Sequence, residues 1–146
     1  MTNGHWMKRA ALGLVFLATA CSDVTDPDGI AGTYALIEAE GQALPAVVFD
    51  GETDAGHVVA TALSGTLTLR SSTYTQRVVF NLVLNGADLG SAPVTVNGSY
   101  SADGQLLTFE PDQGEPAVVT GTLSGGVLTT VEDSPEYGQL ELVWRR

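Results

Sequence analysis

The stretch of sequence that decides the fold is residues 73–85, TYTQRVVFNLVLN. Its even positions are apolar except for Gln76, and its odd positions include Thr75, Arg77 and Asn81, which suit solvent. A period of two residues is typical of a β-strand with one buried face. Antiparallel strands show this alternation, whereas helix-covered parallel strands are apolar on both faces. The stretch therefore predicts a half-buried antiparallel strand.

Three further stretches, residues 65–70, 94–100 and 139–145, alternate in the same way. After residue 31 the chain is rich in Val, Thr, Leu and Gly, and no stretch of a dozen residues keeps a helical apolar period. The sequence therefore predicts an all-β domain, an antiparallel up-and-down meander of eight or nine short strands. Such a meander forms either a closed barrel or a β-sandwich. Closure is favoured because it leaves no open sheet edge.

Short glycine-containing pairs separate the expected strands. Asn85-Gly86, Asp103-Gly104 and Gly125-Gly126 reach positive φ easily and predict tight hairpin turns. A second glycine pattern recurs at Gly32, Gly65, Gly98 and Gly121, each followed by Thr or Ser and then by Tyr or Leu. The residues between these glycines do not match, so we interpret them as strand starts or sharp bends and not as a solenoid repeat.

The N-terminal region has the pattern of an export signal. Residues 7–22, MKRAALGLVFLATACS, place two cations before an apolar run at residues 10–20 and the single Cys21. As a helix this run would span only about 16 Å, and a bilayer core needs about twenty apolar residues. We therefore predict a signal peptide at residues 1–20, with either Met1 or Met7 as its start.

The segment Leu17-Ala18-Thr19-Ala20-Cys21 resembles the lipobox of bacterial lipoproteins. This resemblance implies cleavage before Cys21 and lipid attachment to its sulfur, with the acyl chains holding the protein in a membrane. With Ser22 after the cysteine, the resemblance further implies an outer-membrane location facing the periplasm, with inner versus outer membrane left open. The alternative is an ordinary secretory signal followed by a chance cysteine.

The chain after the signal is strongly acidic. It carries four arginines, no lysine and all seventeen acids, a side-chain charge of −13. Such a surface repels phosphate backbones, so nucleic acid is excluded as a partner. Residues 21–30 are short, polar and acidic and predict a tether, and residues 31–146 form one domain. The acids of the tether and of residues 50–56 lack the remaining ligands of a calcium site.

The sequence offers little for catalysis. His57 is the one histidine after the signal, and we expect it to pair loosely with Asp54 on the surface. One histidine cannot supply a zinc site, and no cofactor motif is present. We therefore expect no catalytic residue, no metal and no cofactor, and a protein that is not an enzyme. Most acids are expected in loops, with no pair marked out: Asp50, Glu52, Asp54, Asp88, Asp112, Glu115, Asp133 and Glu136.

The start of the domain is similar to the opening of bacterial lipocalin-like lipoproteins. The residues that carry this similarity are Gly32-Thr33-Tyr34, then Leu36 and residues 41–45, GQALP. Tyr34 stands where lipocalins have tryptophan. The resemblance implies a barrel in which a C-terminal arginine packs over that aromatic ring, with Arg145 as its counterpart.

Two functions remain open. In the first, the barrel lumen holds a small apolar ligand, and the candidate ligand-binding residues are Tyr34, Phe80, Tyr100 and Trp144. In the second, the protein is a structural or interaction lipoprotein that docks an envelope protein through acidic loops or an exposed strand. A lumen larger than about 300 Å³ would favour the first function, and a filled centre the second. An inward-facing Gln76 would need a polar partner, which a ligand or water could provide.

Overall fold

A computed structural model describes residues 29–113, 119–134 and 138–146, and all regular structure in this part of the chain is β. The ten strands are β1 (Gly32–Ala39), β2 (Gln42–Ala43), β3 (Ala46–Thr53), β4 (Gly56–Arg70), β5 (Thr73–Leu84), β6 (Ala87–Asp103), β7 (Leu106–Pro111), β8 (Val119–Ser124), β9 (Val127–Ser134) and β10 (Gly138–Arg145).

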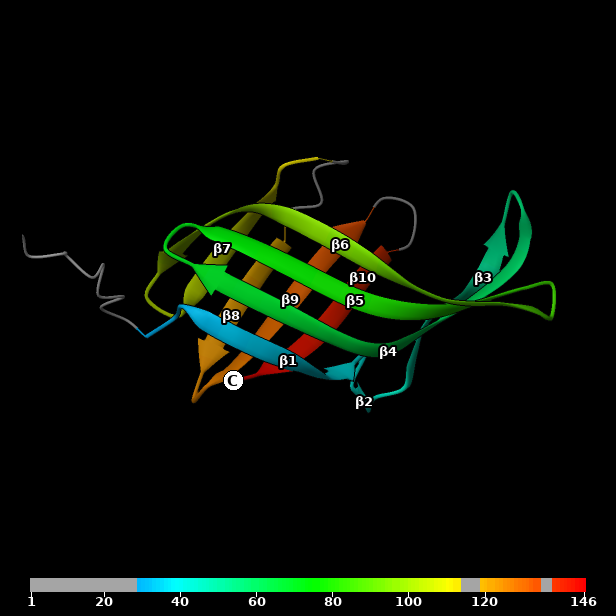
Figure 1. Cartoon of the computed structure of the whole chain (residues 1–146), viewed down its shortest axis with the longest axis horizontal. Coiled ribbons are helices and arrows are strands. Elements are labelled where there is room, and N and C mark those ends of the chain that lie inside the picture. The colour runs from blue at the N-terminus through cyan, green and yellow to red at the C-terminus, as the bar shows by residue number, and fades with distance from the viewer. Residues whose placement is uncertain (1–28, 114–118, 135–137) are drawn as a thin grey trace, which may run out of the picture.

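The strands form one antiparallel sheet that closes on itself (Figure 1). From β4 to β10 each strand pairs with its neighbour in sequence, and β1 pairs with both β10 and β4. These pairings make an eight-stranded barrel of β1 and β4 to β10, with β2 and β3 as additional strands. The prediction of an all-β closed meander is confirmed, and the β-sandwich alternative is set aside.

Strand β4 is longer than the barrel needs, and two strands share one of its edges. Residues 66–69 pair with β1, which closes the barrel, and residues 56–62 pair with β3. Beyond the barrel, β3, β4, β5 and β6 continue as a four-stranded extension, seen at the right of Figure 1. We call this extension the projecting sheet and define it by residues 46–53, 56–62, 80–84 and 87–92.

The chain enters and leaves the barrel at the end opposite the projecting sheet. Residue 29 leads into β1 at the left of Figure 1, and the turns at residues 71–72, 104–105 and 125–126 lie at the same end. We call this the N-terminal end of the barrel, and the opposite one the far end. The molecule therefore has two distinct poles.

The structure confirms two of the expected turns and shifts the third. Residues 85–86 and 125–126 form turns as predicted, whereas the third turn lies one residue later than expected, at Gly104 and Gln105. Two strands are longer than predicted, because β4 begins at Gly56 and β6 begins at Ala87. Their extra residues belong to the projecting sheet. The alternation of apolar and polar residues is weak there, because the successive residues 58–60 are all apolar although they point to alternate faces.

The prediction that the recurring glycines are strand starts holds for one of the four, and the alternative of sharp bends stays a prediction for the others. Only Gly32 begins a strand, whereas Gly65, Gly98 and Gly121 lie inside β4, β6 and β8. All three are inward-facing positions beside large side chains. A Cβ on Gly98 would lie 2.7 Å from a ring carbon of Tyr74, and one on Gly121 would lie 3.0 Å from Phe109. Gly98 and Gly121 therefore leave room for aromatic rings, and Gly65 leaves room for Leu36, which a Cβ would approach to 3.2 Å.

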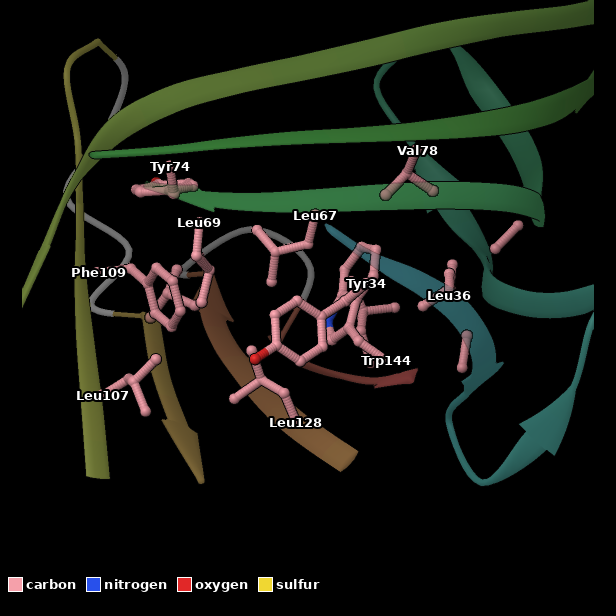
Figure 2. Close-up of a cluster of buried hydrophobic side chains, with 14 of the residues drawn as sticks. Tyr34, Leu36, Leu67, Leu69, Tyr74, Val78, Leu107, Phe109, Leu128 and Trp144 are labelled. Carbon is pink, nitrogen blue, oxygen red and sulfur yellow. The ribbon is translucent and has the colours of Figure 1, made fainter. Parts of the chain in front are cut away.

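Side chains fill the centre of the barrel (Figure 2). They come from β1, β4, β7, β9 and β10, and none is exposed to solvent: Tyr34, Leu67, Leu107, Leu128, Leu142 and Trp144. An eight-stranded barrel is just wide enough either to be filled in this way or to hold one small ligand. The centre of this barrel is filled by its own side chains.

Candidate functional site

The C-terminal residue closes the N-terminal end of the barrel. The guanidinium of Arg146 lies 5.9 Å from the ring centroid of Tyr34 and donates hydrogen bonds to the carbonyl oxygens of Gly29 and Ala31. The Tyr34 hydroxyl donates to the carbonyl oxygen of Ile30 at 2.7 Å. The arginine that covers the aromatic ring is therefore Arg146, and the expected counterpart Arg145 is wrong by one position. Arg145 follows the inward-facing Trp144 on β10 and therefore points outward, because adjacent residues of a strand point to opposite faces.

A cavity of about 460 Å³ opens at this same end. Its walls come from Ile30, Tyr34 and Leu123, from the turns around Gly104 and Gly125, and from Arg146. This volume is above the threshold of about 300 Å³ at which a lumen would favour ligand binding. The cavity, however, lies at the rim of the barrel and not in its filled centre.

The structure does not gather the four candidate ligand residues around one cavity. Tyr34 and Trp144 are buried on the neighbouring strands β1 and β10, and Tyr34 alone lines the cavity at the N-terminal end. Phe80 is half-buried where β5 leaves the barrel. Tyr100 is half-buried on β6, with its ring centroid 6.0 Å from that of Phe109. A shared apolar lumen lined by these four residues is therefore absent from the described part of the chain.

Two polar pairs lie among the apolar side chains of the barrel. Gln76 points inward, as the sequence suggested, and its side-chain nitrogen donates to Glu132 Oε1 at 2.9 Å. Trp144 Nε1 donates to Thr130 Oγ1 at 3.0 Å. Glu132 and Thr130 are both inward positions of β9. The partner of Gln76 is thus another residue of this chain.

Glu132 sits in an environment that disfavours its charge. Burial raises its pKa above the ordinary value, and the hydrogen bond from Gln76 opposes this effect in part. Burial also raises the pKa of Tyr74 to about 12, with the charges of Glu132 and Asp112 adding to the effect. A cavity of about 150 Å³ adjoins these groups, with Val96 and Val119 in its walls.

His57 lies on the projecting sheet and pairs with two carboxylates. Its Nε2 is 3.1 Å from Asp50 Oδ1, and its Nδ1 is 3.4 Å from Glu52 Oε1. The expected partner Asp54 is wrong, because Asp50 and Glu52 lie beside His57 on the paired strand β3. All three side chains are largely exposed. Among the described residues, no group of His, Cys, Asp and Glu side chains is arranged to hold a metal ion.

The expectation that most acids lie in loops is also wrong. Asp50, Glu52, Asp88 and Asp133 lie in strands, and Asp54 forms the turn between β3 and β4. Asp112 follows β7 outside a strand. Glu115 and Glu136, like Cys21 and the whole expected signal and tether up to residue 28, lie outside the described residues.

The inner face of the projecting sheet, which continues the lining of the barrel, carries no polar side chain until Thr53 at its tip. The strand registers place its residues in three rows, each running across β3, β4, β5 and β6. We call these twelve residues the apolar rows: Ala46, Ala62, Phe80 and Ala92; Phe49, Ala60, Leu82 and Gly90; Gly51, Val58, Leu84 and Ala87.

Part of this apolar face is open to solvent. Leu82 exposes 37% of its surface, and Val94, which borders the rows on β6, exposes 52%. The opposite face carries the charges, with Asp50, Glu52 and His57 at one side and Asp88 at the other. The projecting sheet therefore has one apolar side that the barrel does not fully cover, and a second side on which these charges stand among valines such as Val47, which exposes 45% of its surface.

Comparisons with protein-family models, with curated proteins and with solved structures found no match to this chain. The described residues contain no helix long and apolar enough to cross a membrane.

We expect Glu132→Gln to stabilise the protein near pH 8 and to have less effect near pH 4. The folded state holds the carboxyl proton more tightly than the unfolded chain does, so ionisation destabilises the fold as pH rises through and above the ordinary value of 4.5. Below that value both states are protonated and the penalty disappears. The substituted glutamine can still accept from Gln76. Urea unfolding at the two pH values measures the gain.

The exposed neighbour Asp133 provides the control, because Asp133→Asn removes one charge from the same strand without burial. A gain for Glu132→Gln that is equal at both pH values, or equal to that of the control, would contradict the assignment of Glu132 as a destabilising buried acid.

Proposed function

We propose that this chain is an exported bacterial lipoprotein that presents the projecting sheet to another protein of the cell envelope, without catalysis. The observation that carries the proposal is the set of apolar rows, which form a partly exposed face outside a filled barrel. Cys21 is the proposed lipid attachment site, supported by the signal pattern of residues 7–22. The proposed location is the outer membrane, facing the periplasm.

The two poles of the molecule suit this function. From Cys21 to residue 29 the chain can span at most about 28 Å, so an acylated Cys21 would keep the N-terminal end of the barrel near the bilayer. Three of the four arginines after the signal lie at this end: Arg70 and Arg145 are the last residues of β4 and β10, and Arg146 follows β10. The projecting sheet lies at the opposite end (Figure 1), where a partner could reach it.

The size of the apolar face is consistent with a binding surface. Four strands about 4.8 Å apart and three rows about 6.6 Å apart give the whole face an area of roughly 400 Å². The part open to solvent is smaller, because Ala46 and Ala62 are buried. Contiguous apolar patches of about 300–600 Å² are the largest on ordinary monomers and are often functional. A face of this size supports a weak or transient complex more than a permanent one.

The cavity at the N-terminal end supports a second candidate function, the binding of a small molecule. It is about 460 Å³ in volume and combines the Tyr34 ring with the Arg146 cation. Its mouth would face the bilayer if Cys21 is acylated. We rank this function second because the centre of the barrel is filled and the cavity is confined to the rim.

Replacing the proposed lipid attachment site tests the anchor. We expect Cys21→Ala to move the protein from the membrane fraction to the soluble fraction, because the acyl chains supply the membrane affinity. Fractionation after a high-salt wash, with circular dichroism to show that the β fold is kept, provides the measurement. Ser22→Ala, one residue later, should stay with the membrane. If the Cys21→Ala protein still sediments with membranes, the anchor proposal is wrong.

Photo-crosslinking in cells tests the docking surface. A benzophenone amino acid in place of Leu82 should give a discrete crosslinked adduct, since this side chain lies on the exposed part of the apolar rows. The same group in place of the exposed Ser99 on the barrel wall should give none. An adduct at both positions, or at neither, would contradict docking through the projecting sheet.

A further inference from the structure

The edges of the projecting sheet are poorly suited to adding a strand. Val48 is an extra residue in β3 opposite β4, and Leu89 is an extra residue in β6 opposite β5. Such bulges interrupt the regular row of backbone groups. Pro93 on β6 lacks an N–H donor altogether. Since interrupted edges of this kind discourage strand pairing, the partner is expected on the face of the sheet and not along its edge.

Apart from His57, which contacts Asp50 and Glu52, the ionisable residues of the projecting sheet are all acids. Residues 46–62 and 79–95 contain Asp50, Glu52, Asp54 and Asp88 and no lysine or arginine. A four-stranded sheet is about 19 Å wide, so acids at its two sides lie within about one Debye length, roughly 10 Å, of the middle. A molecule resting on the apolar rows is therefore inside the negative field of these acids.

Resting on the docking function proposed above, we infer that the occupant is a protein with an apolar sheet surface bordered by lysine or arginine. Its apolar side chains would pack on the rows around Leu82. Its cations, at the border of that surface, would lie in the field of Asp50 and Glu52 on the edge strand β3 and of Asp88 on β6, although these side chains project from the opposite face of the sheet. Steering by opposite charge raises the rate of encounter, which suits a face of limited area.

Two other occupants fit the charge pattern less well. A second copy would place four acids of each projecting sheet near four of the other, and each chain after the signal has a charge of −13. The area of roughly 400 Å² per copy is also about half of what a standard stable interface buries on each side. A bilayer with anionic headgroups would be repelled by the same acids.

Binding of a matched pair of peptides to the mature chain, residues 21–146 without the signal and with Cys21→Ala, tests this inference. Both peptides are cyclised β-hairpins with valines on one face, and they differ only in having lysines or glutamates at the border. We expect the lysine hairpin to bind at least about tenfold more tightly than the glutamate hairpin at about 50 mM salt, with most of this preference lost at about 500 mM. Fluorescence anisotropy measures both affinities.

Substitutions on the two faces of β5 show where the hairpin binds. We expect Leu82→Ser to weaken binding of the lysine hairpin by about tenfold or more, as expected from the loss of one buried leucine. Val83→Ser, the next residue on the opposite face, should leave it nearly unchanged. Circular dichroism and unfolding curves establish that both variants keep the fold. Equal binding to the protein and to its Leu82→Ser variant would overturn the inference.

Further outcomes separate this inference from the docking function. A crosslinked partner at Leu82 that is acidic at its contact surface, together with no preference for the lysine hairpin, would overturn the partner chemistry and leave docking intact. Dimerisation of the mature chain that Leu82→Ser abolishes, measured by sedimentation, would make a second copy the occupant. Flotation of the Cys21→Ala protein with anionic vesicles would identify a membrane as the occupant of the apolar rows. Either result would overturn the inference.

Discussion

The rest of the structure depends on how one edge of β4 is divided. This strand has fifteen residues, and the barrel uses only its second half for closure against β1. Its first half pairs with β3 and holds β5 and β6 in an extended sheet beyond the barrel. The closed barrel and the projecting sheet are therefore parts of one hydrogen-bonded network, and the apolar lining of the barrel continues outward as the apolar rows.

Closure decides where ligands and partners can bind. The two ends of the domain come together at the N-terminal end of the barrel. There Arg146 covers the Tyr34 ring and donates hydrogen bonds to backbone carbonyl oxygens that precede β1. Between this end and the far end the centre is packed with leucine and aromatic side chains. The inward glycines, such as Gly98 beside Tyr74, make that packing possible. The exposed part of the apolar rows lies outside the barrel, on the projecting sheet.

The sequence predicted the barrel well and the site poorly, for physical reasons. Apolar and polar residues alternate along residues 73–85 because one face of β5 lines the core. This pattern predicted a half-buried antiparallel strand, and similar stretches led to the closed meander. Glu132 was missed because β9 places Thr130 and Glu132 inward, which hides the alternation. The projecting sheet was missed because the successive residues Val58 and Val59 point to opposite faces of β4 and are both apolar, so no alternation marks the strand. Only strand register, which depends on the bulges at Val48, Leu63 and Leu89, shows which side chains share a face.

The central claim is that this protein acts through an exposed apolar sheet and not through a ligand inside its barrel. Native mass spectrometry of the mature chain carrying Cys21→Ala, exported by the cell and purified without detergent, tests this claim most directly. The account predicts the bare mass of the polypeptide, unchanged when candidate lipids are added. A discrete additional mass of a few hundred daltons, retained by the Leu82→Ser variant, would contradict it, because the bound molecule would then occupy the barrel.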